Sequence, residues 1–402
     1  MSGGHSVLVV IGTRPEGIKL APVVGALRER SDALETRVAL TGQHTDLIDQ
    51  VLEAFELAID RDLGIMREGQ SLYDVAHGCL DGLRAVVEAY RPELVLVQGD
   101  TATVLFASLV AYFERTRVGH VEAGLRSRDK WRPYPEEVFR HLTGVLADLH
   151  FAPTAAARSN LLEEGVEPER IFLTGNPVVD AVGHMAARER EVRDDALRAA
   201  LADPRRLVLV TAHRRESFGE PIREAFRAIR ALADRHEDVV FLYPVHPNPE
   251  VRRPATALLG GHDRIRLTDP LDYFDLLRAL RHATLVLTDS GGIQEEAPTF
   301  GTPVVVLRAV TERPEGVEAG VALLVGTDRE RIEAAVDRLL RNDEARARMS
   351  ARANPYGDGR AAERIADIVA HTLTGRARRT EDLRVEDVRR DEVRAEDRRA
   401  ET

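Results

Sequence analysis

The stretch Thr288–Pro298, TDSGGIQEEAP, combines glycines, a serine and acidic residues in a pattern that favours phosphate binding. An apolar run at 284–288 precedes it and a helix-forming segment follows, so a predicted strand leads into a helix N-terminus. Backbone N–H groups at such an end attract anions. Ser290, Gly291 and Gly292 leave room for a diphosphate beside the main chain, because glycine has no Cβ. An ordinary strand-loop-helix turn explains the same residues, since short motifs give false positives.

A second candidate anion site follows the first predicted strand, in the segment GTRPEGIK at 12–19. Its glycine spacing imitates a P-loop, but Ile18 stands where the lysine belongs and Leu20 supplies no metal-binding hydroxyl, so a Walker-type NTPase is rejected. Arg14 and Lys19 could both face a diphosphate, because they follow the carboxyl end of a strand. The alternative is a solvated helix start with two surface cations.

Three carboxylates lie just beyond predicted strands or in a loop that enters a helix, at Asp100, Glu122 and Glu136. The carboxyl ends of parallel strands share one edge of a sheet, so we expect the three acids to lie near one another. Like charges raise each other's pKa, and such sets suit acid/base chemistry at a carbon or a hydroxyl. Taken alone, each acid is more simply explained as a helix cap or a surface charge.

Two histidines follow predicted strands in the second half of the chain. His213, flanked by Arg214 and Arg215, could contact a phosphate or donate a proton, whereas His246 fits loop packing better. No histidine or carboxylate grouping has metal-ligand spacing, so no metal is expected. No Gly-x-Gly-x-x-Gly follows a strand, so no nicotinamide cofactor is expected either.

Short runs of valine, leucine and isoleucine recur along the chain, each followed by an amphipathic stretch. Near-continuous apolar runs are typical of strands buried on both faces of parallel sheets. Two series of them predict an α/β fold with two doubly wound Rossmann-like domains, 1–180 and 181–374, facing a central cleft that binds the ligand. The predicted strands are 7–11, 37–41, 94–97, 117–120, 149–152, 207–211, 239–243, 264–267, 285–287 and 304–307.

The composition of the 402 residues narrows the function classes. A net charge of −11 argues against nucleic-acid binding, which needs a basic face. The single cysteine, Cys79, excludes an intrachain disulfide and indicates a reducing, cytoplasmic location. No apolar run approaches the ~20 residues of a membrane span, so no membrane partner is expected. Residues 375–402 are almost all charged, and they are predicted to form a disordered tail.

Ten stretches together resemble the non-hydrolysing UDP-N-acetylglucosamine 2-epimerase family, over about residues 5–370. Each stretch is weak on its own, but ten in register make a specific match. They are GTRPEGIK at 12–19, TGQH at 41–44, QGDT at 98–101, HVEAGLRS at 120–127, PYPEE at 133–137, TGNPVVD at 174–180, HRRESFG at 213–219, HPNP at 246–249, TDSGGIQEEAP at 288–298 and TERPEG at 311–316.

The resemblance implies a fold of the glycosyltransferase-B type, with the last helix crossing back to the first domain, and a homodimer. It also implies reversible conversion of UDP-GlcNAc to UDP-ManNAc. Transferred motif by motif, the implied catalytic residues are Asp100, Glu122, Glu136 and His213. The implied substrate-binding residues are Arg14, Lys19, Ser290, Gly291 and Gly292 at the diphosphate, Glu296 at the ribose, and Arg313 with His213 at the nucleotide or its phosphates.

The implied reaction has a chemical rationale. No carbonyl group acidifies the C2 proton of the sugar, so simple deprotonation is unfavourable. Elimination of UDP from C1 with loss of the C2 proton gives 2-acetamidoglucal, and UDP then adds back while a proton reaches the opposite face of C2. Cations and N–H groups that stabilise the departing diphosphate are expected to make the largest contribution to catalysis. Domain closure is expected to keep 2-acetamidoglucal and UDP from escaping.

The segment after Pro270 departs from the family pattern. Leu276 stands at a position that is usually aromatic and close to the uracil, and Leu271 stands at one that is usually polar. Both positions are implied to border the substrate, so stacking on the uracil is in question. Tyr273 or Phe274 could compensate for the missing ring.

A second departure concerns activation by substrate, which bacterial members show through another UDP-GlcNAc molecule near the TGQH segment. Gln43 and His44 of that segment are present. Asp46 and Gly69 replace bulkier polar or basic residues. The sequence therefore leaves activation of this protein open.

Other functions fit the same features. A UDP-sugar glycosyltransferase of the same fold would need a similar nucleotide site, but it would not need three carboxylates. A 2-epimerase for a modified sugar, such as a 2,3-diacetamido uronic acid, would carry the same motifs. A hydrolysing epimerase that releases free ManNAc and a UDP-sugar-binding protein without catalytic activity also remain open.

Overall fold

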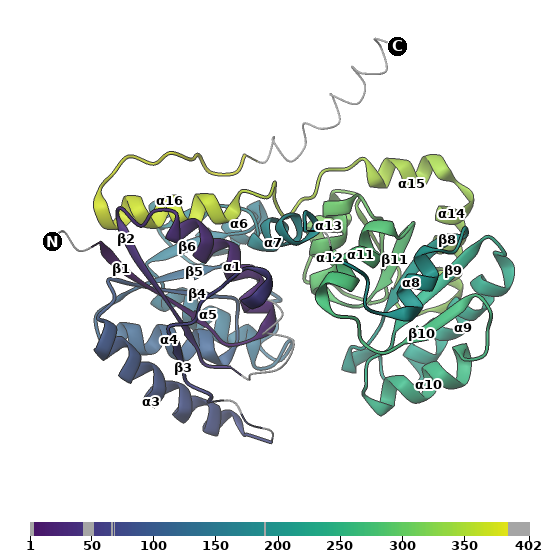
Figure 1. Cartoon of the computed structure of the whole chain (residues 1–402), viewed down its shortest axis with the longest axis horizontal. Helices are drawn as coiled ribbons and strands as arrows, with labels where there is room; N and C mark the ends of the chain where they lie inside the picture. Colours follow the sequence, from purple (N-terminus) through teal and green to yellow (C-terminus); the bar gives the residue numbers. More distant parts are fainter. Residues whose placement is uncertain (1–3, 43–51, 66, 68, 189, 385–402) are drawn as a thin grey trace, which may run out of the picture. The chain divides into compact units, whose positions relative to one another are not determined.

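The computed structural model describes residues 4–42, 52–65, 67, 69–188 and 190–384 (Figure 1). Their contacts divide the chain into two compact units. Unit 1 contains the described residues up to Ala181 together with those from Tyr356 onward, and unit 2 is Val182–Pro355. The chain therefore leaves unit 1, builds unit 2 without interruption and then returns.

Unit 1 is built on a seven-stranded sheet in the order β3-β2-β1-β4-β5-β6-β7. All neighbouring strands are parallel, and the strand order reverses between β1 and β4. Such a reversal leaves a crevice at the carboxyl ends of the strands, where ligands bind in open α/β sheets. The strands are β1 His5–Ile11, β2 Leu34–Leu40, β3 Arg61–Asp62, β4 Leu94–Gln98, β5 Arg117–Val121, β6 Leu149–Ala152 and β7 Ile171–Leu173.

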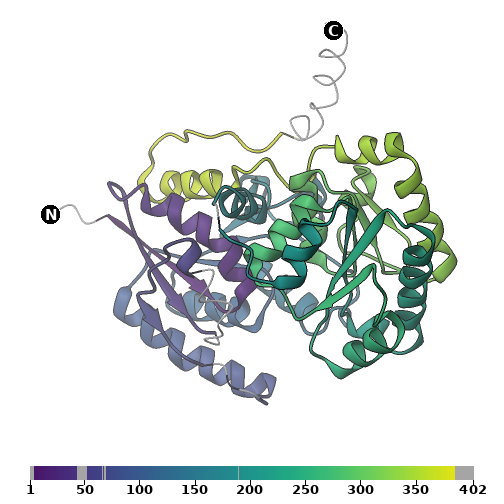
Figure 2. The same ribbon diagram turned by 45° about the vertical axis from the view of Figure 1, so that its right-hand side comes forward.

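Helices cover both faces of this sheet (Figure 1). On one face, Leu8, Val10, Val95 and Val97 pack against the buried sides of α3 and α4, while α16 lies along α1 on the other (Figures 1 and 2). This double cover explains why β1 and β4 read as continuous apolar runs. The helices are α1 Arg14–Arg28, α3 Leu72–Tyr90, α4 Ala102–Phe113, α5 Glu136–Leu146, α6 Ala155–Glu163, η1 Pro168–Arg170, α7 Pro177–Ala186, which crosses into unit 2, and α16 Ala361–Thr374.

Unit 2 repeats the plan with six parallel strands in the order β10-β9-β8-β11-β12-β13. Its core packs Phe226 of α9 against Phe241 and Tyr243 of β9. The strands are β8 Arg206–Thr211, β9 Val239–Pro244, β10 Ile265–Thr268, β11 Leu285–Thr288, β12 Val304–Val306 and β13 Ala322–Leu324. The helices are α8 Asp195–Leu201, η2 Arg215–Ser217, α9 Glu220–Arg235, α10 Pro249–Leu259, α11 Tyr273–His282, α12 Gly291–Glu296, η3 Ala297–Phe300, α13 Pro314–Glu318, α14 Arg329–Arg341 and α15 Asp343–Ser350.

The predicted fold class, an α/β chain with two doubly wound units, is confirmed. All ten predicted strands lie on strands of the structure, with ends that differ by a few residues. The strands β3, β7 and β13 were not predicted, because each has only two or three residues and too little pattern to recognise. Within the described residues, no helix is both long and apolar enough to cross a membrane.

The first part of the predicted tail differs from the expectation of disorder, because residues 376–384 lie against unit 1. The buried carboxylate of Asp367 accepts hydrogen bonds from Arg379 N at 2.6 Å and from Thr380 N at 2.7 Å. Beside the edge strand β7, Leu383 N donates to the Leu173 carbonyl at 2.7 Å, and the Leu383 side chain is buried. The charged composition concealed these anchors, and disorder of 385–402, outside the described residues, stays a prediction.

Replacement of Leu383 by alanine tests this attachment. The change should lower the free energy of unfolding of unit 1 by about 2–4 kcal/mol, as for other buried leucines. Urea titration followed by the fluorescence of Trp131, the single tryptophan and a residue of unit 1, measures the effect. The exposed Leu162 of α6 provides the control, since Leu162→Ala should cost less than about 0.5 kcal/mol. Equal costs would contradict a docked segment.

Candidate active site

The reversal point of the unit 1 sheet brings three loops together. The loop after β1 carries Gly12 and Thr13, the loop after β4 carries Asp100 and Thr101, and β5 ends next to Glu122. Gly12 allows the loop after β1 to lie against Thr103, because a Cβ on Gly12 would lie 2.4 Å from the Thr103 hydroxyl oxygen. Parallel strands that end at one edge therefore place the predicted acidic residues close to the predicted anion loop.

Glu122 occupies the centre of this edge and is buried. Lys19 Nζ donates to its Oε1 at 2.6 Å, Asn176 Nδ2 donates to the same oxygen at 3.1 Å, and Gln98 Nε2 donates to Oε2. The Glu122 backbone is left-handed, with φ of 64°. Non-glycine residues seldom adopt this region, and such strain gathers at functional sites. We call Lys19, Gln98 and Asn176 the Glu122 cage.

Asp100 lies on the neighbouring loop and contacts Arg140 of α5. Arg140 also lies 3.3 Å from Glu137, whose carboxylate accepts hydrogen bonds from Ser127 N at 3.1 Å and Arg128 N at 3.0 Å. The α5 helix therefore fixes the Asp100 side chain. Sequence reasoning missed Arg140, although its spacing of three residues from Glu137 on a predicted helix offers a signal.

Glu136 begins α5 and is partly exposed. No hydrogen bond or ion pair of its carboxylate is found among the described residues. Its neighbour Glu137 is buried, so of this acidic pair it is Glu136 that keeps a carboxylate accessible to a ligand.

His120 supports the same loops from inside β5, and sequence reasoning did not select it. Its Nε2 lies 2.7 Å from the Gly99 carbonyl oxygen. Burial lowers the pKa of His120 to about 4, so the ring is neutral near pH 7 and Nε2–H donates to Gly99. This hydrogen bond holds the turn that leads into Asp100.

Glu16 joins two of the loops and was likewise missed, because it looked like part of an anion-binding segment. Its carboxylate accepts from Gly12 N at 2.6 Å, from the Thr13 hydroxyl at 2.9 Å and from the Thr101 hydroxyl at 2.8 Å. Burial raises the pKa of Glu16 to about 7; these hydrogen bonds oppose the rise, and nearby Asp100 adds to it. A carboxylate therefore crosslinks the two loops from within.

In unit 2, the loop after β11 meets the loop after β8. The buried carboxylate of Asp289 accepts hydrogen bonds from His213 N at 2.7 Å and from Arg214 N at 2.8 Å. Ser290 caps α12 without a side-chain hydrogen bond, and its N–H donates to Thr288 Oγ1 at 2.9 Å. Asp289 thus connects the loop after β11 to the backbone of His213 and Arg214, which lie 76 and 75 residues away in sequence.

The His213 ring lies against other groups of this edge. It stacks on His246, with ring centroids 5.5 Å apart and planes inclined by 13°, and its Nδ1 lies 3.5 Å from Asp289 Oδ1. Burial lowers the pKa of His213, and the Asp289 charge acts in the opposite direction. His246, which the sequence favoured only for loop packing, thus lies directly beside a candidate catalytic residue.

The predicted nucleotide-binding residues gather around α12. Arg313 Nε donates to Glu295 Oε1 at 2.9 Å. A Cβ on Gly291 would lie 3.0 Å from the Arg313 Cζ atom, so the guanidinium rests against a glycine backbone. The Tyr273 hydroxyl donates to Glu296 Oε1 at 3.3 Å. A cation beside the N-terminus of a helix fits an anionic ligand.

The leucines at the proposed uracil positions differ in exposure. Leu271 is buried, whereas Leu276 is partly exposed. Tyr273 is buried, and its hydroxyl donates to Glu296. Phe274 is partly exposed, and the Arg190 Cζ atom lies 4.7 Å from the centroid of the Phe274 ring. Of the two rings proposed as substitutes, Phe274 is the more accessible.

The predicted site residues thus form one group in each unit. Unit 1 brings together Lys19, Asp100 and Glu122, and it places Arg14 and Glu136 at the starts of α1 and α5. Unit 2 brings together His213 and the residues of α12 and Arg313. Gln43 and His44 lie outside the described residues. The sequence predicts Lys19 at a diphosphate, and in the structure its ammonium group contacts Glu122.

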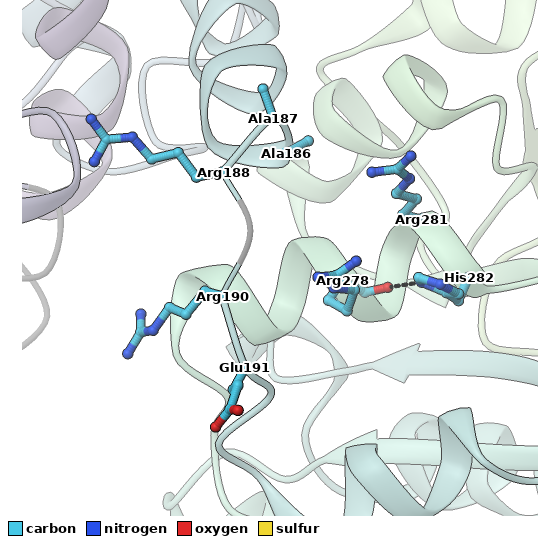
Figure 3. A pocket seen from close by; sticks show the side chains of 8 residues that line it. All are labelled: Ala186, Ala187, Arg188, Arg190, Glu191, Arg278, Arg281 and His282. Carbon is cyan, nitrogen blue, oxygen red and sulfur yellow. Dashed lines mark hydrogen bonds between the residues drawn. The ribbon is translucent and has the colours of Figure 1, made fainter.

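Unit 2 also has a cavity of about 690 Å³ that contains none of the predicted site residues (Figure 3). Its lining includes Arg188 and Arg190 after α7, and Arg278, Arg281 and His282 in the last turns of α11. Cations near a helix C-terminus are favoured by the helix dipole, and His282 Nδ1 lies 2.8 Å from the Arg278 carbonyl oxygen. The dipole of α11 therefore explains why basic side chains of this helix line the cavity.

Fold and site together define an α/β protein of the glycosyltransferase-B type, with acidic and basic groups at the carboxyl ends of parallel strands. Residues 26–370 match the family model described as UDP-N-acetylglucosamine 2-epimerase. The chain belongs to this family.

A UDP-N-acetylglucosamine 2-epimerase from Yersinia pestis is 50% identical over 366 residues, which cover 89% of this chain and 96% of that protein. The crystal structure of a relative from Listeria monocytogenes has a TM-score of 0.87 at 45% identity, and covers 95% of this chain and 100% of that one. A UDP-GlcNAc 2-epimerase from Neisseria meningitidis, solved bound to UDP-GlcNAc, has a TM-score of 0.85 at 39% identity, with coverage of 92% and 100%.

The raised pKa of Glu16 predicts a pH-dependent stability that Glu16→Gln removes. The folded pKa of about 7 exceeds the ordinary value of 4.5. Between these values the folded protein keeps a proton that the unfolded chain has released, so this contribution to stability is lost as the pH rises from about 4.5 to 7. Relative to the Glu16→Gln variant, the free energy of unfolding of the wild type should fall by roughly 3 kcal/mol between pH 4.5 and 8.

Urea unfolding across this pH range measures the difference, with Glu88→Gln on α3 as the matched control. Glu88 forms an exposed pair with Arg84, so its replacement should leave the pH dependence unchanged. If the free energy of unfolding had the same pH dependence in the wild type and in Glu16→Gln, the raised pKa of Glu16 would be contradicted.

Proposed function

We propose that the protein catalyses the reversible conversion of UDP-GlcNAc to UDP-ManNAc by inversion at C2 of the sugar. The observation that carries this proposal is the family match across residues 26–370. The geometry of unit 1 supports it, because acidic residues surround the end of the sheet where ligands bind in this class of fold.

The proposed reaction proceeds by elimination and re-addition. A carboxylate takes the C2 proton, the C2–H electrons form the C1–C2 double bond, and the C1–O bond breaks with its electrons moving to the UDP oxygen. For return, that oxygen attacks C1 while C2 receives a proton on the opposite face. Atoms balance without oxidation, so no redox cofactor is required.

The residue roles follow from the surroundings of each group. Glu122 accepts hydrogen bonds from three donors that fix the position of its carboxylate, and it is the candidate for the base that removes the C2 proton. Asp100 and Glu136 are the candidates for the opposite face. Arg313 and the N–H groups at Gly291 and Gly292 are proposed to stabilise the departing diphosphate, the step where electrostatic stabilisation counts most.

Incubation of the protein with UDP-GlcNAc alone in D2O tests the proposal. NMR should detect deuterium at C2 and the appearance of UDP-ManNAc, because the C2 proton passes through a carboxylate that exchanges with solvent. Glu122→Gln should lower turnover at least about 100-fold while UDP affinity changes less than about threefold. Glu88→Gln serves as the control and should match the wild type.

Different results identify the other functions. Transfer of the sugar to an added acceptor without exchange at C2 would establish a glycosyltransferase. Release of free ManNAc and UDP would establish a hydrolysing epimerase. Faster turnover of a 2,3-diacetamido uronic acid substrate would establish the modified sugar as substrate.

We also propose that the protein is a homodimer, as the family resemblance implies. Large apolar side chains are exposed on the adjacent helices α4 and α5. Val138, Leu142 and Val145 recur at intervals of four and three residues and so share one face of α5, with Val145 83% exposed. Tyr112 and Phe113 lie at the end of α4. Apolar stripes of this kind favour protein–protein contact.

Val145→Arg should convert the dimer to a monomer, because it places an unpaired charge in an apolar contact. Light scattering after size-exclusion chromatography measures the mass. The control is Leu162→Arg on α6, which should keep the dimer. A dimer that survives Val145→Arg would place the interface elsewhere.

A further inference from the structure

Asn176 lies in the turn between β7 and α7, and no chemistry has so far been assigned to it. Its side chain is buried and uses both ends of its amide. The Nδ2 group donates to Glu122 Oε1 at 3.1 Å, and Oδ1 accepts from Val178 N at 3.1 Å. Its backbone N–H donates to the Tyr356 carbonyl at 2.7 Å. The residue therefore links the candidate catalytic carboxylate to a distant part of the chain.

Within the Glu122 cage, Asn176 has a distinct task. Lys19 reaches Oε1 with a long flexible side chain, and Gln98 reaches Oε2 from the end of β4. Asn176 has two side-chain torsions, and its amide is fixed at the other end by Val178. A donor held in this way restricts the rotation of the carboxylate better than a lysine, which keeps more rotamer freedom.

The turn that carries Asn176 is itself held by the end of the chain. Arg364 of α16 donates to the Thr174 carbonyl at 3.1 Å and makes two hydrogen bonds of 2.7 Å to the Asp358 carboxylate. Arg364 Nε donates to the Glu381 carbonyl at 3.1 Å. We call Tyr356, Asp358, Arg364 and Glu381 the C-terminal clamp. Every member lies in unit 1 with Asn176 and Glu122.

We propose that Asn176 is a positioning residue for the Glu122 carboxylate, and that the C-terminal clamp keeps it in place. The inference rests on the proposed epimerase function, in which Glu122 must face C2 of the sugar. Asn176 does not itself touch the substrate. Catalytic geometry tolerates little displacement, and a shift of about 1 Å can cost 100-fold in rate.

A structural role alone would explain Asn176 as the cap of α7. That role uses only Oδ1, however, and a capping residue needs no donor. Asn176→Asp separates the two roles, because a carboxylate keeps the acceptor for Val178 N but cannot donate to Glu122. It also places a second negative charge 3.1 Å from Glu122 Oε1. Asn176→Ser keeps a capping oxygen, adds no charge and is too short to reach Glu122.

The matched control is Asn342→Asp. Asn342 caps α15 in unit 2, where its Oδ1 accepts from Ala345 N at 2.9 Å. The same chemical change is thus made at a helix cap that has no contact with a candidate site residue.

The experiment measures kcat and KM for UDP-GlcNAc over a range of pH, with the rate of deuterium uptake at C2 and thermal unfolding of each variant. Near pH 7, Asn176→Asp should lower kcat about 10–100-fold, with KM within about threefold. It should also shift one limb of the kcat–pH profile to higher pH by about one pH unit, because two carboxylates in contact resist ionising together. Lys19 of α1 is the charged contact that opposes this shift.

Asn176→Ser should lower kcat about tenfold without moving that limb, and Asn342→Asp should match the wild type. Both Asn176 variants should take up deuterium at C2 more slowly, in proportion to kcat. The proposal is overturned if they match Asn342→Asp, or if activity falls only in step with the folded fraction. A wild type that shows no exchange at C2 would instead defeat the proposed function, so the two failures are distinguishable.

Discussion

The contact between Lys19 and Glu122 is the interaction around which the candidate site of unit 1 is organised. Both groups are largely shielded from water, with side-chain exposures of 11% and 5%, and their N and O atoms are 2.6 Å apart. Removing two charges from water costs several kcal/mol per ion, and the pair recovers this only with good geometry and further hydrogen bonds. Gln98 and Asn176 supply those hydrogen bonds. Such an arrangement is a poor way to gain stability alone, so its presence agrees with a catalytic use.

The other features of this sheet edge serve the same end. His120 is kept neutral by burial and holds the Gly99 turn, and Glu16 crosslinks the loops after β1 and β4. Unit 2 applies the same principle with Asp289, which gathers the loops after β8 and β11. In each unit a buried acid fixes backbone loops, and the groups proposed to meet the ligand project from those loops. The rigid part of the site is therefore held by side-chain to backbone hydrogen bonds together with side-chain to side-chain ones.

The sequence predicted most of the fold, because strands buried on both faces leave continuous apolar runs such as 94–97 and 239–243. It also predicted that Asp100 and Glu122 lie near each other, since both follow parallel strands. It could not predict the partners of these groups. Asn176 meets Glu122 across 54 residues of sequence, and Arg140 meets Asp100 across 40. Such pairs depend on register and on side-chain direction, which leave no local pattern. The segment 376–384 was misjudged because composition reports charge but not the few apolar and hydrogen-bonding anchors.

The return of the chain to unit 1 has a consequence for synthesis on the ribosome. Asn176 emerges early, whereas Tyr356 and Arg364 emerge only after all of unit 2. At about 5–20 residues per second, the intervening stretch takes roughly 10–35 s to make. During that time the first sheet lacks α16, and its edge strand β7 lacks the cover of residues 376–384. A nascent or prematurely ended chain that lacks Tyr356 and Arg364 would therefore leave the turn at Asn176 without the C-terminal clamp.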